Sequence, residues 1–220
     1  MCGRPSFDGK THPGCKTRYA IDGVFSALKY KGIVKKLVYQ FKYKPFLSDL
    51  KSVLSDFLYE SLIQNENFMT TMQQFNNVTI FFVPIPLHSS RFKQRGYNHA
   101  EILAEELGKK FDIPVANLLE RTKQTRSQFG LKRDERKENL KNAFSYSSLH
   151  TLSSRAKRGN LLPQEITSSG STSLTIPRNY STTVFLIDDI LTTGSTLLEA
   201  ANILKRHGTK HVWGITLARD

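Results

Sequence analysis

The chain has 220 residues, of which 39% are hydrophobic and 23% charged, as expected for one ordinary domain with at most a small appendage. Lysine and arginine outnumber aspartate and glutamate by 32 to 19, and the resulting net charge of +13 favours anionic partners, with a merely solvated basic surface as the alternative. No run approaches the roughly 18 apolar residues of a membrane span and no signal peptide begins the sequence, so we expect a cytoplasmic protein.

Residues 1–20 contain both cysteines and few periodic apolar residues. Two cysteines in a cytoplasmic chain do not indicate a disulfide framework. His12 and Cys15 have the His-x-x-Cys spacing of half a zinc site, to which Cys2 could add a third ligand. Three ligands do not close a structural tetrahedral site, so two free thiols and an exposed histidine are the alternative.

From Gly23 to Leu62 the apolar spacing predicts helices. One helical face carries Val34, Leu37, Val38 and Phe41, and a second carries Phe46, Leu50, Val53, Leu54, Phe57 and Leu58. We expect the remaining surface of the first helix to carry six lysines: Lys29, Lys31, Lys35, Lys36, Lys42 and Lys44.

The run Val78–Val83 has the composition of a strand and stops at Pro84. It leads into a predicted basic loop with Arg91, Lys93 and Arg95, in which the guanidinium groups of the two arginines suit phosphate oxygens. An amphipathic helix follows, with Asn98 and Glu101 as its capping residues and an apolar stripe of Ala100, Leu103, Ala104, Leu107 and Phe111.

The polar stretch 121–139 is long for a structured connection, which is typical of functional lids. A surface for single-stranded nucleic acid is the alternative, because Phe129 lies among Arg126, Lys132 and Arg133 and could stack a base. Serine and threonine then dominate, and the apolar periodicity disappears. We expect a disordered insertion near 148–182.

The last part of the chain predicts a strand over 183–187, a helix from Thr196 to Arg206 closed by Gly208, and a strand from Val212 to Leu217. Strands that alternate with helices indicate a parallel sheet covered on both faces. The expected fold class is therefore α/β, with a small segment 1–20 and a domain 21–220 whose helical start covers 21–65.

An acid pair, Asp188 and Asp189, follows the apolar strand, and the loop Thr192-Thr193-Gly194-Ser195-Thr196 comes directly after it. Small hydroxyl residues around a glycine let backbone N–H groups surround an anion at a helix N-terminus. Two carboxylates can accept hydrogen bonds from vicinal hydroxyls, so this segment predicts a sugar-phosphate site at the carboxyl end of a strand. A turn capped by Thr196 and Glu199 is the alternative, whereas a Walker A loop is excluded because no lysine follows Gly194.

The segment 186–196 resembles the phosphoribosyl-pyrophosphate (PRPP) motif of type I phosphoribosyltransferases. More narrowly, the chain resembles the ComF/GntX branch, the competence-associated members. The motif Val83-Pro84-Ile85-Pro86-Leu87 and the motif Arg95-Gly96-Tyr97-Asn98 match that branch, although Tyr97 and His99 stand where it has Phe and Gln. The resemblance extends to a polar motif and the chain end: Arg121, Thr125, Gln128, Leu131, Arg136, Asn139, Ala143-Phe144 and Leu217-Ala218-Arg219.

The resemblance implies the type I phosphoribosyltransferase fold and a reaction in which a nucleophile displaces pyrophosphate from C1 of PRPP. Asp188 and Asp189 would hold the ribose and its Mg²⁺, and Thr192 to Thr196 the 5′-phosphate. Arg91, Lys93 and Arg95 would form the pyrophosphate loop, and the lid would contain Arg121, Thr125, Gln128, Arg136 and Asn139.

The branch often begins with a zinc ribbon, of which Cys2, His12 and Cys15 would be a remnant; either the start codon lies upstream or the ribbon has decayed. The resemblance also implies a role in DNA uptake, with single-stranded DNA and a competence helicase as expected partners. A non-catalytic PRPP-binding or DNA-handling protein is the competing interpretation, because a fold does not settle a function.

Overall fold

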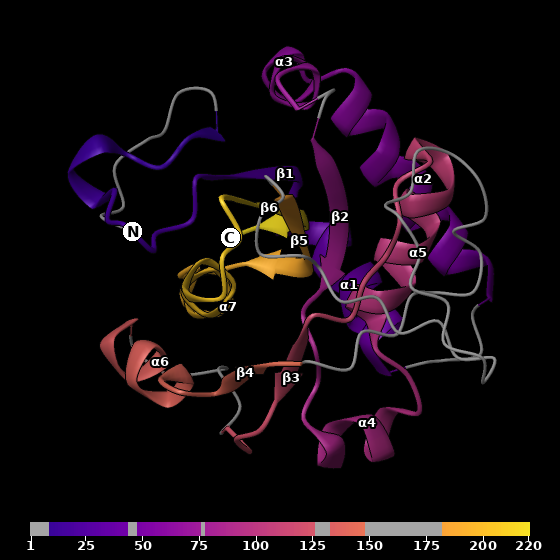
Figure 1. The fold of residues 1–220 in the computed structure, drawn as a ribbon. Coiled ribbons are helices and arrows are strands. Elements are labelled where there is room, and N and C mark those ends of the chain that lie inside the picture. Colours follow the sequence, from indigo (N-terminus) through magenta and orange to yellow (C-terminus); the bar gives the residue numbers. More distant parts are fainter. Residues whose placement is uncertain (1–8, 44–47, 76–77, 126–132, 148–181) are drawn as a thin grey trace, which may run out of the picture.

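The fold is built on a parallel sheet of four strands, seen edge-on near the centre of Figure 1. The computed structural model describes residues 9–43, 48–75, 78–125, 133–147 and 182–220. In this part of the chain the strand order is β1 (Gly23–Lys29), β6 (His211–Arg219), β5 (Thr182–Leu191) and β2 (Thr79–Pro84). The central strands β5 and β6 are nearly continuous apolar runs because both of their faces are covered.

Helices cover both faces of the sheet, which confirms the predicted α/β class. One face packs against α1 (Gly32–Tyr43), α2 (Ser48–Ile63), α3 (Glu66–Gln73) and α5 (His99–Phe111). The other face packs against α7 (Ser195–Arg206), the hairpin β3 (Leu119–Arg121) with β4 (Phe144–Tyr146), and the end of α6 (Arg133–Leu140). The hairpin and α6 lie beside α7, away from α1 and α2 (Figure 1).

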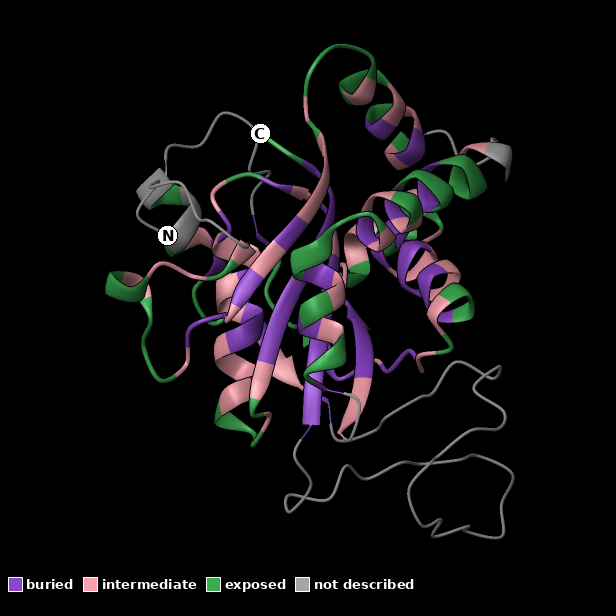
Figure 2. Cartoon of the chain, turned by 90° about the horizontal axis from the view of Figure 1, so that it is seen from above, coloured by how far each residue is buried: buried purple, intermediate pink, exposed green. Residues whose placement is uncertain are grey.

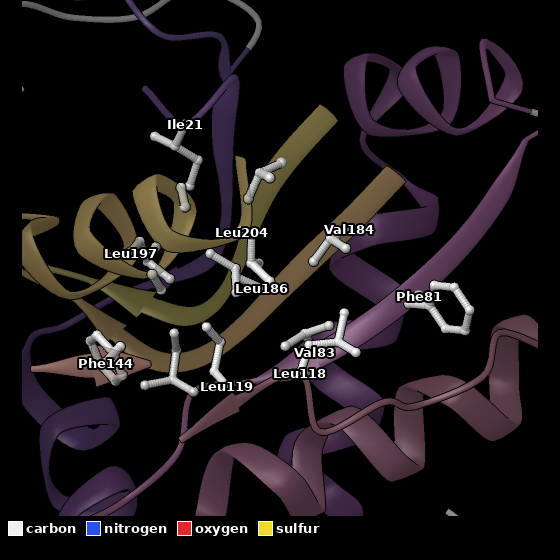
Figure 3. Packing of buried hydrophobic residues seen from close by; sticks show 14 of the residues in the cluster. Ile21, Phe81, Val83, Leu118, Leu119, Phe144, Val184, Leu186, Leu197 and Leu204 are labelled. Atoms are coloured by element: carbon white, nitrogen blue, oxygen red, sulfur yellow. The ribbon is translucent and has the colours of Figure 1, made fainter. Parts of the chain in front are cut away.

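Two cores form because side chains alternate across β5. Val184 and Leu186 point into the core under α7, where Leu197 and Leu204 also lie (Figure 3). Phe185 and Ile187 belong to the opposite core, and these four residues of β5 are fully buried. Buried residues concentrate on the strands of the sheet and on one side of the helices that cover it (Figure 2). This packing fixes the strand, and with it the residues at its carboxyl end.

The helix predicted from Gly23 is wrong at its start, because Gly23–Lys29 is strand β1 and pairs in parallel with β6. The apolar residues of this short stretch fit helical as well as strand spacing, so periodicity alone could not separate the two. Long-range pairing with β6, about 190 residues away, decides the conformation: Gly23 lies opposite Trp213 and Phe25 opposite Ile215.

The predicted basic loop after β2 is also wrong, because Ser89–Arg95 forms helix α4, which His88 begins and Gly96 ends in the left-handed conformation. In contrast, β2, β6, α5 with its Asn98 cap, and α7 are confirmed within a few residues.

A short 3-10 turn, η2 (Pro13–Cys15), lies in the N-terminal segment. The predicted insertion near 148–182 falls almost wholly outside the described residues, which resume at 182. None of the described helices is long and apolar enough to cross a membrane.

Candidate functional site

The acid pair lies at the open carboxyl end of the sheet. β5 extends beyond its predicted end and includes Asp188 and Asp189. Its pairing with β2 stops at Ile187, opposite Pro84, whereas its pairing with β6 continues through Asp188. The acids therefore emerge where one neighbouring strand has ended, which leaves that side of β5 available to a ligand.

The two carboxylates have different partners. Asp189 is buried, and its Oδ2 lies 2.7 Å from Lys42 Nζ of α1 and 2.9 Å from His99 Nε2 at the first residue of α5. Asp188 Oδ1 accepts a hydrogen bond of 2.9 Å from the backbone N–H of Asp189. Asp189 thus contacts charged or polar side chains from two helices, while in the described part of the chain Asp188 makes only this local hydrogen bond and no ion pair.

This difference separates the acidities of the pair. Burial and the neighbouring charge of Asp189 raise the pKa of Asp188 to about 7. Burial alone would also raise the pKa of Asp189, but the charges and hydrogen bonds of Lys42 and His99 hold it below its usual range. Two adjacent carboxyl groups therefore differ in charge near neutral pH, with Asp189 as the fixed anion.

The loop after β5 leads into a helix whose N-cap is a glycine. Gly194 is the N-cap of α7, with a φ of 74°, and makes no side-chain capping bond. Thr193 Oγ1 lies 2.9 Å from Ser195 Oγ and accepts a bond of 3.4 Å from the Ser195 N–H. Glu199 accepts a hydrogen bond of 2.8 Å from the Asn142 N–H, which ties α7 to the turn after α6. The partial positive charge at the N-terminus of this three-turn helix favours an anion beside Gly194.

Arginine side chains from two separate segments meet at Thr125. Arg91 of α4 donates to the Thr125 carbonyl at 3.0 Å, and Arg121 of β3 donates to its hydroxyl at 2.6 Å. Arg121 is only 9% exposed, its Nε has no hydrogen-bond partner, and it packs over the Phe144 ring at 5.4 Å. Within the described chain, no carboxylate forms an ion pair with Arg91, Arg95 or Arg121.

The arginine cluster, formed by Arg91, Arg95 and Arg121, carries positive charge that no ion pair in the described residues neutralises. Desolvation, together with the charge of Arg91, lowers the pKa of Arg121 to about 10, and the charge of Asp188 opposes this shift. Desolvation and the charge of Arg95 likewise lower the pKa of Arg91. Both guanidinium groups remain charged at neutral pH, so an incoming anion would offset their desolvation and mutual repulsion.

The remaining candidates are placed less centrally. Lys93 is exposed on α4. Thr125 is buried, Asn139 lies on α6, and Arg136 lies on the same helix, where its side chain is outside the description. Gln128 falls outside the described residues, as does Phe129. The lid therefore stays a prediction, although Arg121 and Thr125 form part of a buried cluster.

The acid pair does not fit a resident Mg²⁺. The Oδ2 atom of Asp189 already faces Lys42 and His99, and a cationic partner disfavours a bound cation. No group of three or more histidine, cysteine or acidic residues that could hold a metal is found in the described ranges. For zinc, Cys2 lies outside these ranges, and His12 Nδ1 accepts the Gly14 N–H at 3.3 Å, so that site stays a prediction.

The sequence analysis missed the contributions of α1 and His99. Lys42 was assigned to the solvated surface, but its side chain is only 21% exposed. A signal was present, because Lys42 follows the fully buried Val38 by four residues and so shares its helical face. Tyr43 was also missed: it accepts a bond of 3.3 Å from Arg95, whose guanidinium group lies 5.0 Å from the centre of its ring.

Comparison with known families places the chain in a family. Residues 93–220, more than half of the chain, match the phosphoribosyl transferase domain. The chain belongs to the phosphoribosyltransferase family. Its relatives identify it as a ComF-type member, as the motifs predict. The family match begins inside α4, so β1, α1 and β2 lie before it.

Three curated relatives illustrate the similarity. Competence protein F of Haemophilus influenzae is 35% identical over 139 residues, covering 62% of this chain and 49% of that protein. Competence protein ComFC of Streptococcus pneumoniae is 31% identical over 171 residues, covering 77% and 56%. The DNA utilization protein YhgH of Shigella flexneri is 28% identical over 134 residues, covering 60% and 46%. The chain thus spans about half the length of these relatives.

Proposed function

We propose that the chain binds PRPP and transfers its phosphoribosyl group to an acceptor. The observation that carries this proposal is the acid pair at the carboxyl end of β5, followed at once by the glycine-capped N-terminus of α7. A ribose 5-phosphate needs acceptors for two vicinal hydroxyls and, a few ångströms away, donors for a phosphate. The family membership of the chain supports the same ligand class.

The arginine cluster suits the second charged end of PRPP. Arg91 and Arg121 converge on Thr125 without a carboxylate partner among the described residues, and Asp188 contributes to the electrostatics of Arg121. Guanidinium groups bind phosphate oxygens in forked pairs, and such charge-assisted bonds are stronger than neutral ones. We assign these two arginines to the diphosphate, with Arg95 and Lys93 at its outer side.

In the proposed reaction the bond from ribose C1 to the diphosphate oxygen breaks, and the diphosphate leaves with the electron pair. The acceptor nucleophile forms the new bond to C1 and loses a proton. Asp189 holds the ribose as a fixed anion, and the arginines stabilise the charge that develops on the leaving group. Mg²⁺ would enter as the complex with the diphosphate, as part of the substrate.

Release of pyrophosphate tests the transfer. The protein is incubated with PRPP, Mg²⁺ and a panel of nucleobases and amines, and free pyrophosphate is measured. The proposal predicts release that depends on one class of acceptor and is lost in Asp189→Asn. PRPP binding without release from any acceptor would favour the non-catalytic alternative.

A second candidate function, handling of single-stranded DNA in natural transformation, is favoured by the outer face of α1. Tyr39 and Tyr43 are 60% and 51% exposed, and their ring centroids lie 4.8 Å apart. Three lysines of this region are also exposed: Lys31, Lys35 and Lys36. Exposed aromatic rings beside cations are suited to stacked bases and a phosphate backbone. The names of the relatives, competence protein and DNA utilization protein, support this candidate. A competence helicase is the partner proposed with it.

Salt dependence tests the second candidate. Phosphate contacts release counterions, so the affinity for single-stranded DNA should fall steeply with salt and show little sequence preference. Replacing Lys35 and Lys36 by Met should reduce the affinity for DNA and leave PRPP binding unchanged. No binding at low salt would refute a DNA-binding surface. Loss of DNA binding in folded Asp189→Asn would mean that both ligands share one site.

A further inference from the structure

The contacts of Asp189 are concentrated on one of its two oxygens. Lys42 Nζ lies 2.7 Å and His99 Nε2 lies 2.9 Å from Oδ2. Neither contact involves Oδ1, for which the described residues show no hydrogen-bond partner. Both contacts are ion-pair distances to one oxygen, without hydrogen-bond geometry at Oδ2. Two neighbours on one oxygen restrict the orientation of the carboxylate and leave the other oxygen to accept a hydrogen bond from a ligand.

Lys42 is itself held in place by the residues around it. The Tyr97 hydroxyl donates to the carbonyl of Phe41, the residue before Lys42. The Phe41 ring meets the His99 ring edge-on, with centroids 6.1 Å apart. Asn98, between Tyr97 and His99, donates to the Ile85 carbonyl at 3.0 Å and so fixes the start of α5 beside β2. The end of α1 is therefore attached to the same turn that supplies His99.

From this geometry we infer that Lys42 is a positioning residue for the ribose-binding carboxylate, acting through Asp189 rather than on the diphosphate. The inference rests on the proposed PRPP site and adds to it a residue from outside the matched phosphoribosyl transferase domain. With His99, Lys42 fixes Asp189 so that Oδ1 faces the sugar. Helix α1 thus completes the site that β5 begins.

The competing role for Lys42 is that of a direct phosphate ligand. Burial and the charge of Arg95 lower the pKa of Lys42, and the charges of Asp189 and Asp188 raise it. Lys42 therefore lies near the cationic side of the site. Its ammonium group, however, contacts a carboxylate, whereas Arg91 and Arg121 have no such counter-charge in the described structure. The two roles differ in which part of PRPP loses affinity when the lysine is removed.

Calorimetric titrations with ribose 5-phosphate, pyrophosphate and PRPP at constant Mg²⁺ separate these roles. In Lys42→Met, ribose 5-phosphate and PRPP should bind about tenfold or more weakly, as expected when a charged acceptor is displaced. Pyrophosphate should bind within about twofold of the wild-type affinity, because its arginine ligands are untouched. Lys42→Arg, which keeps the cation, should recover part of the loss. Lys51→Met, an exposed lysine on the neighbouring helix α2, is the matched control.

A double-mutant cycle adds the decisive readout. If Lys42 acts through Asp189, Lys42→Met has no further effect on ribose 5-phosphate affinity in an Asp189→Asn background. Additive losses, or a selective loss of pyrophosphate binding, would overturn the inference. Thermal unfolding identifies folded variants, and Lys42→Gln replaces Lys42→Met if the latter does not fold. Absence of PRPP binding in the wild type would instead contradict the proposed function itself.

Discussion

At the scale of single residues, the site depends on an asymmetry between two adjacent acids. Asp189 makes both ionic contacts, whereas Asp188 accepts only the N–H of its neighbour within the described residues. The raised pKa of Asp188, about 7, means that the folded state holds a proton that the unfolded state releases near pH 4. Stability contributed by Asp188 therefore falls as pH rises from about 4 to 7, and it is constant above that range.

Asp188→Asn should remove this penalty. We expect its free energy of unfolding to exceed that of the wild type by roughly 1–2 kcal/mol at pH 8. The difference is modest because Asp188 is partly exposed, and water reduces the cost of burying its charge. The difference should shrink between pH 7 and pH 4 and vanish below. Urea unfolding at several pH values measures it, and a difference that grows toward acid pH would contradict the assignment.

The acids and the Thr192–Thr196 loop could be predicted because their chemistry is contiguous in sequence. Lys42 and His99 could not be assigned in this way, since their contact with Asp189 depends on how α1 and α5 pack at the end of the sheet. The junction of Arg91 and Arg121 at Thr125 likewise brings together two segments that sequence motifs had placed in separate loops. Spacing along the chain contains no information about such convergence.

At the scale of elements, β1 is the clearest case of tertiary structure overriding local pattern. The strand runs alongside β6, and Phe25 stacks on Trp213 with ring centroids 5.5 Å apart. A glycine is required at Gly23, because a Cβ there would lie 2.4 Å from both the Gly9 carbonyl oxygen and Trp213 Cζ3. The strand and its position therefore depend on a residue that neither helix nor strand propensity favours.

Gly23→Ala should destabilise the fold by roughly 1–3 kcal/mol, the usual cost of forcing an extra methyl group into a packed site. Thermal unfolding measures the loss as a lower melting temperature. Gly14→Ala is the matched control, since its nearest neighbour would lie 3.5 Å from the new Cβ, an ordinary contact. Equal stability of Gly23→Ala and wild type would mean that β1 does not pack on Trp213 as described.

At the scale of the whole molecule, the matched family domain and the folded unit differ. The match starts at residue 93, but β1 and β2, which flank the central strands, lie before it. The segment before residue 93 also supplies α1 and α2, whose Val38, Phe41, Leu54 and Leu58 are buried in the core that contains Phe185. The α/β class was predictable from the alternation of elements, whereas this interdependence follows from the strand order.

A fragment of residues 93–220 should therefore fail to fold. Its sheet would retain only β5 and β6, with the apolar face that α1 and α2 cover left in water. Circular dichroism during heating should show no cooperative transition for the fragment and a cooperative one for the full chain. A cooperative transition in the fragment would mean that α1 and α2 are not needed to cover this face of the sheet.

The most direct test of the central claim is the equilibrium binding of PRPP with Mg²⁺, measured by calorimetry on the full chain. We predict saturable binding that weakens about 10- to 100-fold in Asp189→Asn, the cost of losing a charged hydrogen-bond acceptor. Lys210→Met, an exposed lysine at the amino end of β6, should bind like the wild type. No measurable binding to the folded wild-type protein at millimolar PRPP, or equal binding by Asp189→Asn, would contradict a PRPP site at the end of β5.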